Sequence, residues 1–312
     1  MKFIGIDIGS TCAKTVVMNE NKEIVLEFVQ PTGWSSVDTA EEIRKKLVEN
    51  DADPAENVCV ATGYGRVSVP YADKMITEIT CHAMGAVWIF DNKDMTIIDI
   101  GGQDTKIICV EQGFVKDFMM NDKCSAGTGK FLEIMANRLG VTIAELFDLA
   151  EQGTVVPISS LCTVFAESDL VHKIQMGHKK EDIIAGLCNA VANNYLNNIG
   201  KGKKILAPIV FQGGVSKNEG VVKAFADSLG EEIIVDDNGH LMGCYGAAIL
   251  ALGCGIEKPF SFDVAEMEFV TREVVCPNCP NHCEVICVYR DGELIDSWGN
   301  RCERGEIKQG QE

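Results

Sequence analysis

The residues with the clearest chemical potential occur in a duplicated segment. Ile6-Asp7-Ile8-Gly9 is followed by Lys14, and Ile98-Asp99-Ile100-Gly101 is followed by Lys106, each residue 92 positions after its counterpart. Both copies predict a strand, a tight glycine turn and a second strand. Glycine lets a turn approach a phosphate closely, and the turn amides then point at the anion. The repeat therefore predicts two homologous lobes that face each other across a nucleotide cleft.

Side chains in and beside the two turns supply the other groups that a magnesium nucleotide needs. Asp7, Asp99 and Asp104 are the candidate catalytic residues, because carboxylates hold Mg²⁺ directly or through water. A single copy would be typical of an ordinary β-hairpin, whereas two copies in register favour the cleft. The candidate nucleotide-binding residues of the two copies are Gly9, Ser10, Thr11, Lys14, Gly101, Gly102, Gln103, Thr105 and Lys106.

A third glycine signal follows a buried strand that ends at Gln212. Gly213, Gly214 and Val215 come next, before a helix start, and this pattern suits close approach to a flat adenine or a ribose. Two familiar phosphate motifs do not occur. Phe131 stands where a P-loop needs Ser or Thr, and no G-x-G-x-x-G follows a strand and opens a helix.

Two cysteines, Cys124 and Cys162, each precede apolar residues at helical spacing. Ser160 and Thr163 are expected to cap the second helix. The positive end of a helix lowers a thiol pKa and stabilises an anionic cluster. An iron–sulfur cubane needs four thiolates, so a twofold dimer would place two from each chain around one cluster on its axis. Two buried or capping cysteines remain the alternative from these residues alone.

These segments together resemble the activator, or archerase, of 2-hydroxyacyl-CoA dehydratases, which belongs to a wider ATPase family that includes benzoyl-CoA reductase ATPase subunits. The resemblance covers roughly residues 1 to 255 and rests on five motifs that stand in family order. They are residues 5–11, residues 99–106, Cys124-Ser125-Ala126-Gly127-Thr128-Gly129, residues 162–168 and Gly213-Gly214-Val215.

The resemblance implies an α/β fold of the duplicated acetate kinase/Hsp70/actin type (ASKHA, ribonuclease H-like). It implies a homodimer with one bridging [4Fe–4S] cluster, whose ligand positions match Cys124 and Cys162. It further implies that hydrolysis of Mg-ATP to ADP drives one-electron, low-potential transfer to a partner, either a 2-hydroxyacyl-CoA dehydratase or a double-cubane cluster protein. Reduced ferredoxin or flavodoxin is the implied donor. Gly127 and Gly129 are assigned to cofactor binding and to a hinge of the first cysteine-bearing helix.

The predicted organisation is a first lobe (1–92), a second lobe (93–235), a return to the first lobe (236–258) and a Cys-rich C-terminal extension (259–312). Five cysteines fall within the last part, and Cys287 is expected inside a hairpin that turns at Asp291-Gly292. The other four form a candidate metal site for zinc or a second iron–sulfur cluster, with a tail of free thiols as the alternative. They are Cys276, Cys279, Cys283 and Cys302.

Composition narrows the class of protein. The 312 residues suffice for two buried cores, and the formal net charge of −18 argues against nucleic acid and anionic membranes as partners. No apolar run reaches the length of a membrane span, and Met1 leads directly into a strand-like segment, so a cytoplasmic location without an export signal is expected. The 14 cysteines are then thiols or metal ligands rather than disulfides. The five histidines are expected on surfaces or in packing.

Two rival functions fit the same fold. A small-molecule kinase would need a substrate pocket and no cluster. A nucleotide-regulated binding or assembly protein, like actin or Hsp70, would form filaments or bind peptides and carry no redox signal. Anaerobic purification with iron and sulfide analysis separates both rivals from the electron-transfer ATPase.

Overall fold

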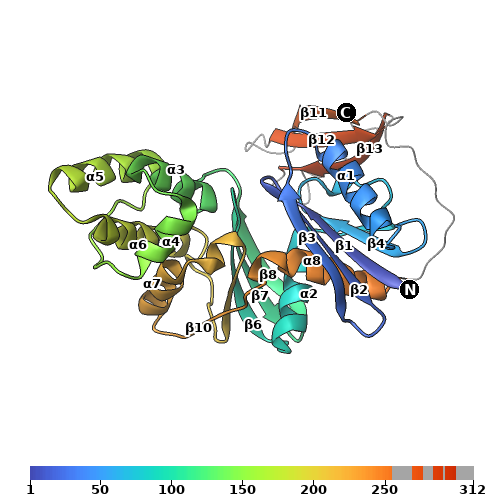
Figure 1. Ribbon diagram of the computed structural model, residues 1–312, viewed down its shortest axis with the longest axis horizontal. Helices are drawn as coiled ribbons and strands as arrows, with labels where there is room; N and C mark the ends of the chain where they lie inside the picture. Colours follow the sequence, from blue (N-terminus) through green and yellow to red (C-terminus); the bar gives the residue numbers. More distant parts are fainter. Residues whose placement is uncertain (255–268, 277–283, 291, 300–312) are drawn as a thin grey trace.

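The computed structural model describes residues 1–254, 269–276, 284–290 and 292–299. Figure 1 shows two sheets side by side, a group of helices beyond the second sheet and a small third sheet above the first. The first sheet has the order β3-β2-β1-β4-β5 and the second has the order β10-β9-β6-β7-β8. Their strands are β1 (Lys2–Ile8), β2 (Cys12–Asn19), β3 (Ile24–Pro31), β4 (Val58–Thr62), β5 (Lys74–Met75), β6 (Met95–Ile100), β7 (Thr105–Glu111), β8 (Phe114–Asn121), β9 (Ile209–Gln212) and β10 (Ile233–Val235).

The two sheets repeat one topology. β1 pairs antiparallel with β2 and parallel with β4, and β6 pairs antiparallel with β7 and parallel with β9. Register repeats as well, because Asp7 lies opposite Lys14 and Asp99 lies opposite Lys106. The duplicated strand–turn–strand unit and the duplicated α/β fold predicted from the sequence are thus confirmed.

The first sheet lies between two helices. The β1 residues Ile4, Ile6 and Ile8 share a buried cluster with α1 (Ser36–Glu49). On the other face, α8 (Met242–Leu252) packs on β1, β2 and β4. The chain after β10 therefore returns to the first sheet, although the domain bounds stay a prediction.

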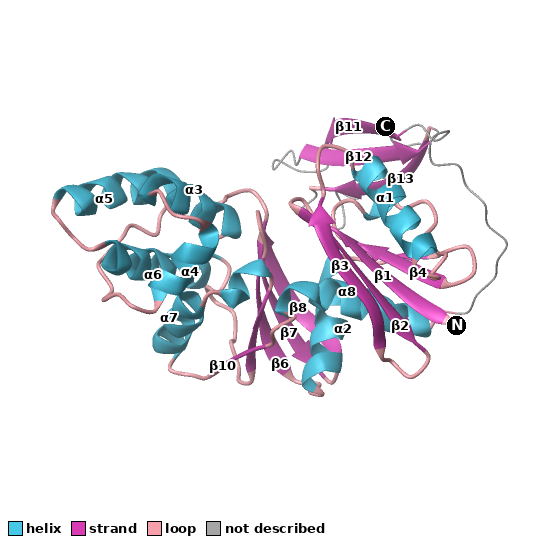
Figure 2. Cartoon of the chain, in the orientation of Figure 1, coloured by secondary structure: helices cyan, strands magenta, loops and turns pink. Residues whose placement is uncertain are grey.

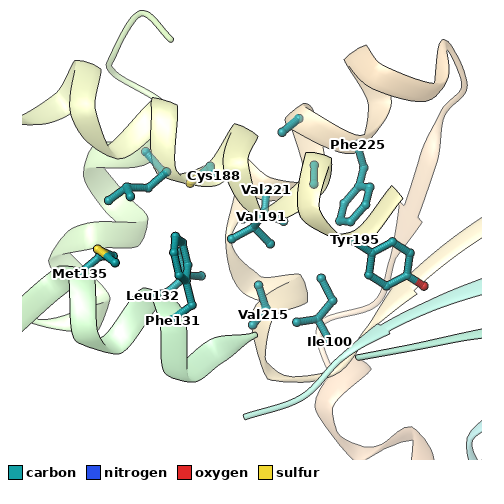
Figure 3. Close-up of a cluster of buried hydrophobic side chains, with 14 of the residues drawn as sticks. Ile100, Phe131, Leu132, Met135, Cys188, Val191, Tyr195, Val215, Val221 and Phe225 are labelled. Atoms are coloured by element: carbon teal, nitrogen blue, oxygen red, sulfur yellow. The ribbon is translucent and has the colours of Figure 1, made fainter. Parts of the chain in front are cut away.

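The second sheet is likewise covered on both faces. Ile97 packs toward α2 (Glu78–Phe90), while Ile98 and Ile100 join a larger cluster on the other face. Figure 3 shows this cluster, in which Ile100, Phe131 and Val191 come from different elements. The helices that form it are α3 (Gly129–Leu139), α4 (Ile143–Ala150), α5 (Thr163–Gln175), α6 (Lys180–Asn198) and α7 (Glu219–Leu229).

Helices α2 and α8 connect the two halves, with glycines at their contact. A Cβ on Gly246 would lie 1.8 Å from the carbonyl oxygen of Cys81, so only glycine permits this distance. The glycine–alanine pattern at residues 243–248 thus permits close packing of α8 on α2. Three short 3-10 turns, η1 (Arg66–Ser68), η2 (Gly214–Lys217) and η3 (Gly239–Leu241), connect the larger elements near the cleft.

The C-terminal sheet is a separate antiparallel unit, seen beside α1 in Figure 2. Its order is β11 (Phe269–Val275), β12 (Glu284–Arg290) and β13 (Glu293–Trp298). The predicted hairpin is confirmed, with Gly292 in its turn and Asp291 outside the described residues. The unit has a small core of its own, which contains Cys276 and Cys287. In the described part of the chain, no helix is long and apolar enough to cross a membrane.

Candidate functional site

The two duplicated aspartates face the same cleft, each paired with the lysine of its own hairpin. Nζ of Lys14 donates to Oδ2 of Asp7 at 3.1 Å, and Nζ of Lys106 lies 3.4 Å from Oδ1 of Asp99. Burial would raise the pKa of Asp7, but Lys14 and His82 overcome this effect and hold the pKa below its usual value. Both carboxylates are therefore ionised and able to bind a hard cation.

Lys106 is the centre of a buried acidic group. It is 2% exposed, donates to Oδ2 of Asp104 and lies 3.6 Å from Oε2 of Glu78. Burial would lower the pKa of Lys106, but Asp99, Glu78 and Asp104 raise it well above its usual value. The backbone is fixed at the same residue, because the Tyr195 hydroxyl donates to the Lys106 carbonyl at 2.6 Å. A buried charge held by several partners is costly to disturb.

Asp99 has a second set of partners from other elements. Nε2 of Gln212, at the end of β9, donates to Oδ2 of Asp99 at 3.1 Å and lies 2.9 Å from Nδ1 of His82. Burial would raise the pKa of Asp99, but His82, Lys106 and the Gln212 hydrogen bond lower it to about 2. Strand β9 and helix α2 thus position the aspartate of the second hairpin.

A cavity of about 260 Å³ lies between the two glycine turns. The turns approach each other closely, since a Cβ on Gly102 would lie 2.4 Å from Oγ1 of Thr11. Most of the residues predicted from the sequence line this cavity. They are Asp7, Gly9, Ser10, Thr11, Lys14, Asp99, Gly101, Gly102, Asp104, Lys106, Gly213 and Gly214.

Five other predicted residues support the cavity from outside its lining. Gln103 is exposed, Thr105 is buried in β7, and Val215 belongs to the apolar core. Gly127 lies beside Asn194, and Gly129 donates its N–H to the Gly101 carbonyl at 3.0 Å. Their roles in nucleotide binding stay predictions.

Six lining residues were not predicted from the sequence, namely Cys12, Val29, Tyr64, Glu78, His82 and His240. Glu78 and His82 stand one turn apart on α2, and His240 lies in η3. The expectation that the histidines belong only to surfaces or packing is wrong for His82 and His240, because α2 and η3 are brought to the cleft by long-range packing. The local signal was the carboxylate and imidazole at helical i, i+4 spacing on α2.

Cys124 lies in the loop before α3, and Cys162 lies at the start of α5. Cys124 is exposed and precedes Thr128, the N-cap of α3, while Cys162 is itself the N-cap of α5. The expected Ser160 or Thr163 cap is therefore wrong; the Thr163 hydroxyl instead lies 3.3 Å from the Ser125 hydroxyl. This contact connects the neighbours of the two cysteines. Across the described residues, no three potential ligands gather in one chain.

Two contacts join these cysteine segments to the rest of the site. The N–H groups of Gly129 and Lys130 donate to the carbonyls of Gly101 and Gly102 at 3.0 and 2.8 Å. The start of α3 is thereby bonded directly to the second glycine turn. Between the helices, Arg138 of α3 pairs with Glu167 of α5 at 2.6 Å.

The C-terminal metal site stays a prediction. Cys276 is buried directly after β11, and Cys279, Cys283 and Cys302 lie outside the described residues. Cys287 is fully buried on β12, as expected for a hairpin interior.

Comparison with known proteins decides the family. The model of the BadF/BadG/BcrA/BcrD ATPase family matches residues 4–251. The chain belongs to this family. It is 43% identical over 255 residues to the (R)-2-hydroxyglutaryl-CoA dehydratase activating ATPase of Acidaminococcus fermentans, covering 80% of this chain and 96% of that protein. The C-terminal sheet lies outside the region that the family matches.

Solved structures agree with this family assignment. The crystal structure of the Acidaminococcus fermentans component A has a TM-score of 0.75, covering 81% of this chain and 98% of that one. The activator of 2-hydroxyisocaproyl-CoA dehydratase from Clostridium difficile, with bound ADPNP, has a TM-score of 0.74 at 37% identity, covering 81% and 95%. A ROK family glucokinase from Streptomyces griseus, at 12% identity and a TM-score of 0.52 over 81% of this chain and all of that one, shares the fold alone. The family is thus an ATPase family of the actin-like fold whose relatives activate CoA dehydratases.

Proposed function

We propose that this protein is an ATP-driven electron-transfer activator. Two chains hold one [4Fe–4S] cluster through Cys124 and Cys162 of each chain. Hydrolysis of Mg-ATP is coupled to low-potential, one-electron reduction of a partner iron–sulfur protein. The proposed acceptor is a 2-hydroxyacyl-CoA dehydratase or a double-cubane cluster protein, and the proposed donor is ferredoxin or flavodoxin.

The cysteine pair fits half of such a cluster site. Cys162 is the N-cap of α5, Cys124 lies four residues before the N-cap of α3, and the Ser125–Thr163 contact keeps their loops together. A cubane cluster needs four thiolates, so a second copy of the chain must supply the two that one chain lacks. When bound, the cluster would supply the stored electron.

The single observation that carries the coupling is the bond between glycine turn and helix. The carbonyls of Gly101 and Gly102 accept from the first N–H groups of α3, while the same turn lines the nucleotide cavity. Those N–H groups are ones that a helix cannot satisfy internally. A shift of the turn on phosphate binding or release therefore moves the start of α3, and with it the segment that bears Cys124.

The chain's own side chains provide the chemistry of hydrolysis. Asp7, Asp99 and Asp104 would hold Mg²⁺ through its waters, Lys14 and Lys106 would offset the phosphate charge, and the turn amides would orient the phosphates. Catalysis of this type rests on positioning and charge stabilisation rather than on covalent attack. ATP must bind the two arrangements of the dimer with different affinity, because equal affinity shifts no equilibrium.

The first test is anaerobic iron and sulfide analysis of the purified dimer. Cys124→Ala and Cys162→Ala should each remove the bridging cluster and leave ATP binding intact, while Cys109→Ala, half-buried in β7 away from the helices, should retain it. A normal cubane spectrum in both variants, after subtraction of metal in the extension, would overturn the assignment.

The second test addresses coupling. The wild-type cluster is titrated electrochemically and exposed to an iron chelator with Mg-ATP, with Mg-ADP and without nucleotide. Potential or accessibility should differ between nucleotide states, because burial and hydrogen bonding set the potential of a cluster. Identical potential and accessibility in all three states would show that the cluster is structural and is not coupled to ATP hydrolysis.

The C-terminal cysteines are proposed as a separate metal site. The end of β11, the start of β12 and the end of β13 lie together at one end of the small sheet. Val275 lies opposite Glu284, and Ile286 lies opposite Trp298. A three-stranded sheet with so small a core needs an additional cross-link, such as a bound metal ion, to be stable. The doubly substituted Cys124→Ala/Cys162→Ala dimer should therefore retain zinc or iron, measured by elemental analysis; metal-free protein would exclude this site.

A further inference from the structure

His240 has a buried nitrogen for which the described part of the chain offers no hydrogen-bond partner. It lines the nucleotide cavity, and among the described residues its Nδ1 atom has no hydrogen-bond partner although that atom is buried. A buried polar atom without a partner costs about 1–3 kcal/mol, so such atoms in a binding cavity point to a ligand.

The position of η3 decides which part of a ligand is near. The carbonyl of Gly239 accepts from the N–H of Gly213 at 3.1 Å, so His240 follows a residue that is bonded to the Gly213-Gly214 turn. The side of the cavity with the carboxylates is formed by other elements, namely the two hairpins and α2. A site with one turn of glycines and one imidazole suits the flat, uncharged end of a nucleotide.

The protonation state agrees with an uncharged partner. Burial, Lys217 and Lys14 lower the pKa of His240 to about 4, and Asp236 only partly opposes them. The imidazole is therefore neutral near pH 7 and offers one donor and one acceptor rather than a positive charge for phosphate.

We propose that His240 is a nucleoside-recognition residue, whose imidazole turns its covered Nδ1 toward the cavity when nucleotide binds and hydrogen-bonds to a ribose hydroxyl or to the edge of the base. This inference rests on nucleotide binding in the cavity and adds the residue that reads the uncharged part of the nucleotide. A neutral hydrogen bond contributes on the order of 1 kcal/mol.

The test compares two probes on the full dimer, Mg-ATP and Mg-tripolyphosphate, by calorimetry. His240→Ala should weaken Mg-ATP binding about tenfold and leave Mg-tripolyphosphate binding unchanged. His240→Asn, whose amide stands near the place of Nδ1, should recover most of the loss, and His172→Ala on the exposed face of α5 should match wild type. Equal loss for both probes, or no loss for either, would overturn the proposal. A wild-type protein that binds neither probe would instead contradict the proposed function.

An independent observation concerns the C-terminal sheet, which contacts the first lobe through a side-chain ion pair. Asp296 of β13 forms an ion pair with Arg66 of η1, and both side chains are about one-fifth exposed. Arg66 also donates to the Gly63 carbonyl at 3.0 Å, and a Cβ on Gly63 would lie 2.4 Å from Oδ1 of Asp7. The sheet is thus linked by consecutive contacts to a catalytic carboxylate.

The end of β13 also forms one wall of a second cavity, of about 770 Å³. Ser297 and Gly299 line it together with Tyr64 of the first lobe and Phe118 and Lys123 of the second. Tyr64 and Glu78 line this cavity and the nucleotide cavity alike. The C-terminal sheet, the first lobe and β8 therefore border the same cavity.

We infer that the C-terminal sheet acts as an intramolecular stop, which is held on the first lobe by the Arg66–Asp296 pair and limits lobe closure. Asp296→Asn keeps the shape of the side chain and removes its charge. The variant should close more readily and so hydrolyse ATP several-fold faster than wild type. Glu293→Gln, the same change at an exposed position of β13, is the matched control and should leave turnover unchanged. Turnover in Asp296→Asn that equals the control, or falls below it, would overturn the inference.

Discussion

A Cβ atom on Gly102 would lie 2.4 Å from Oγ1 of Thr11, although the two residues belong to different sheets. The glycine turns of the repeat therefore meet each other directly, and the missing side chain of one makes room for the hydroxyl of the other. Closure of the cleft depends on this distance.

Gly102→Ala should consequently weaken ATP binding about tenfold, roughly 1.4 kcal/mol, because the added methyl group holds the turns apart. Thr11→Ser in the same chain should restore part of the affinity, since serine lacks the second branch and can rotate its hydroxyl away. Titration calorimetry of the single and double variants measures the coupling. Full additivity of the two changes would show that the turns do not meet in the nucleotide complex.

Asp7→Asn and Asp99→Asn should each lower the rate of ATP hydrolysis by at least about tenfold, roughly 1.4 kcal/mol in the barrier. Both residues occupy equivalent positions in the repeat and retain ionised carboxylates in a buried cleft. Asp117→Asn, which removes an exposed ion pair with Lys203, is the control. Unchanged turnover in both cleft variants would discard the duplicated-cleft mechanism.

Glu78 should act on the attacking water. It lies at the boundary of the two cavities, and burial raises its pKa above the usual value, although Lys106 opposes this shift. A carboxyl with a raised pKa accepts a proton more readily. Glu78→Gln should therefore lower kcat at least tenfold while the affinity for ATP changes less than twofold. A loss that appears in binding alone would make Glu78 a ligand of the nucleotide instead.

The pKa of Asp99 predicts a specific loss of stability in acid. Its pKa of about 2 in the folded protein lies below the pKa of 3.8 of the free side chain, so the ionised group favours the folded state at higher pH. This contribution is complete above pH 3.8 and is lost as the pH falls toward 2. Urea unfolding of wild type and Asp99→Asn at pH 3 and pH 6 checks it. The difference between the two proteins should be smaller at pH 3, and a difference that grows in acid would reverse the assignment.

The sequence predicted the duplicated hairpins well, because strand alternation, glycine turns and the Asp–Lys spacing are local and occur twice. Twelve of the residues that it predicts for nucleotide binding and catalysis line one cavity, although their roles stay predictions. Glu78, His82 and His240 were missed because their helices reach the cleft only through packing of α2 against α8. No local pattern encodes that contact except the glycines at the crossing.

The cysteine helices show a different limit of local reasoning. Their starts were located to within a few residues, but the cap of α5 was assigned to neighbouring hydroxyls rather than to Cys162. Hydroxyl caps are favoured on average, yet here the Thr163 hydroxyl faces Ser125 on another segment. The Ser125–Thr163 contact and the bonds from α3 to the glycine turn are tertiary relationships that spacing alone does not contain.

The Asp–Lys pairs of the two hairpins have a consequence for what enters the cleft. Asp7, Asp99, Asp104 and Glu78 carry more formal negative charge than Lys14 and Lys106 can neutralise, and the whole protein is acidic as well. A bare polyanion would meet repulsion there, whereas the same polyanion with its divalent counterion would restore electroneutrality. On the proposed function, the cleft would therefore discriminate by counterion: it would admit the magnesium complex of the nucleotide and resist the free nucleotide, before any contact with the base is made.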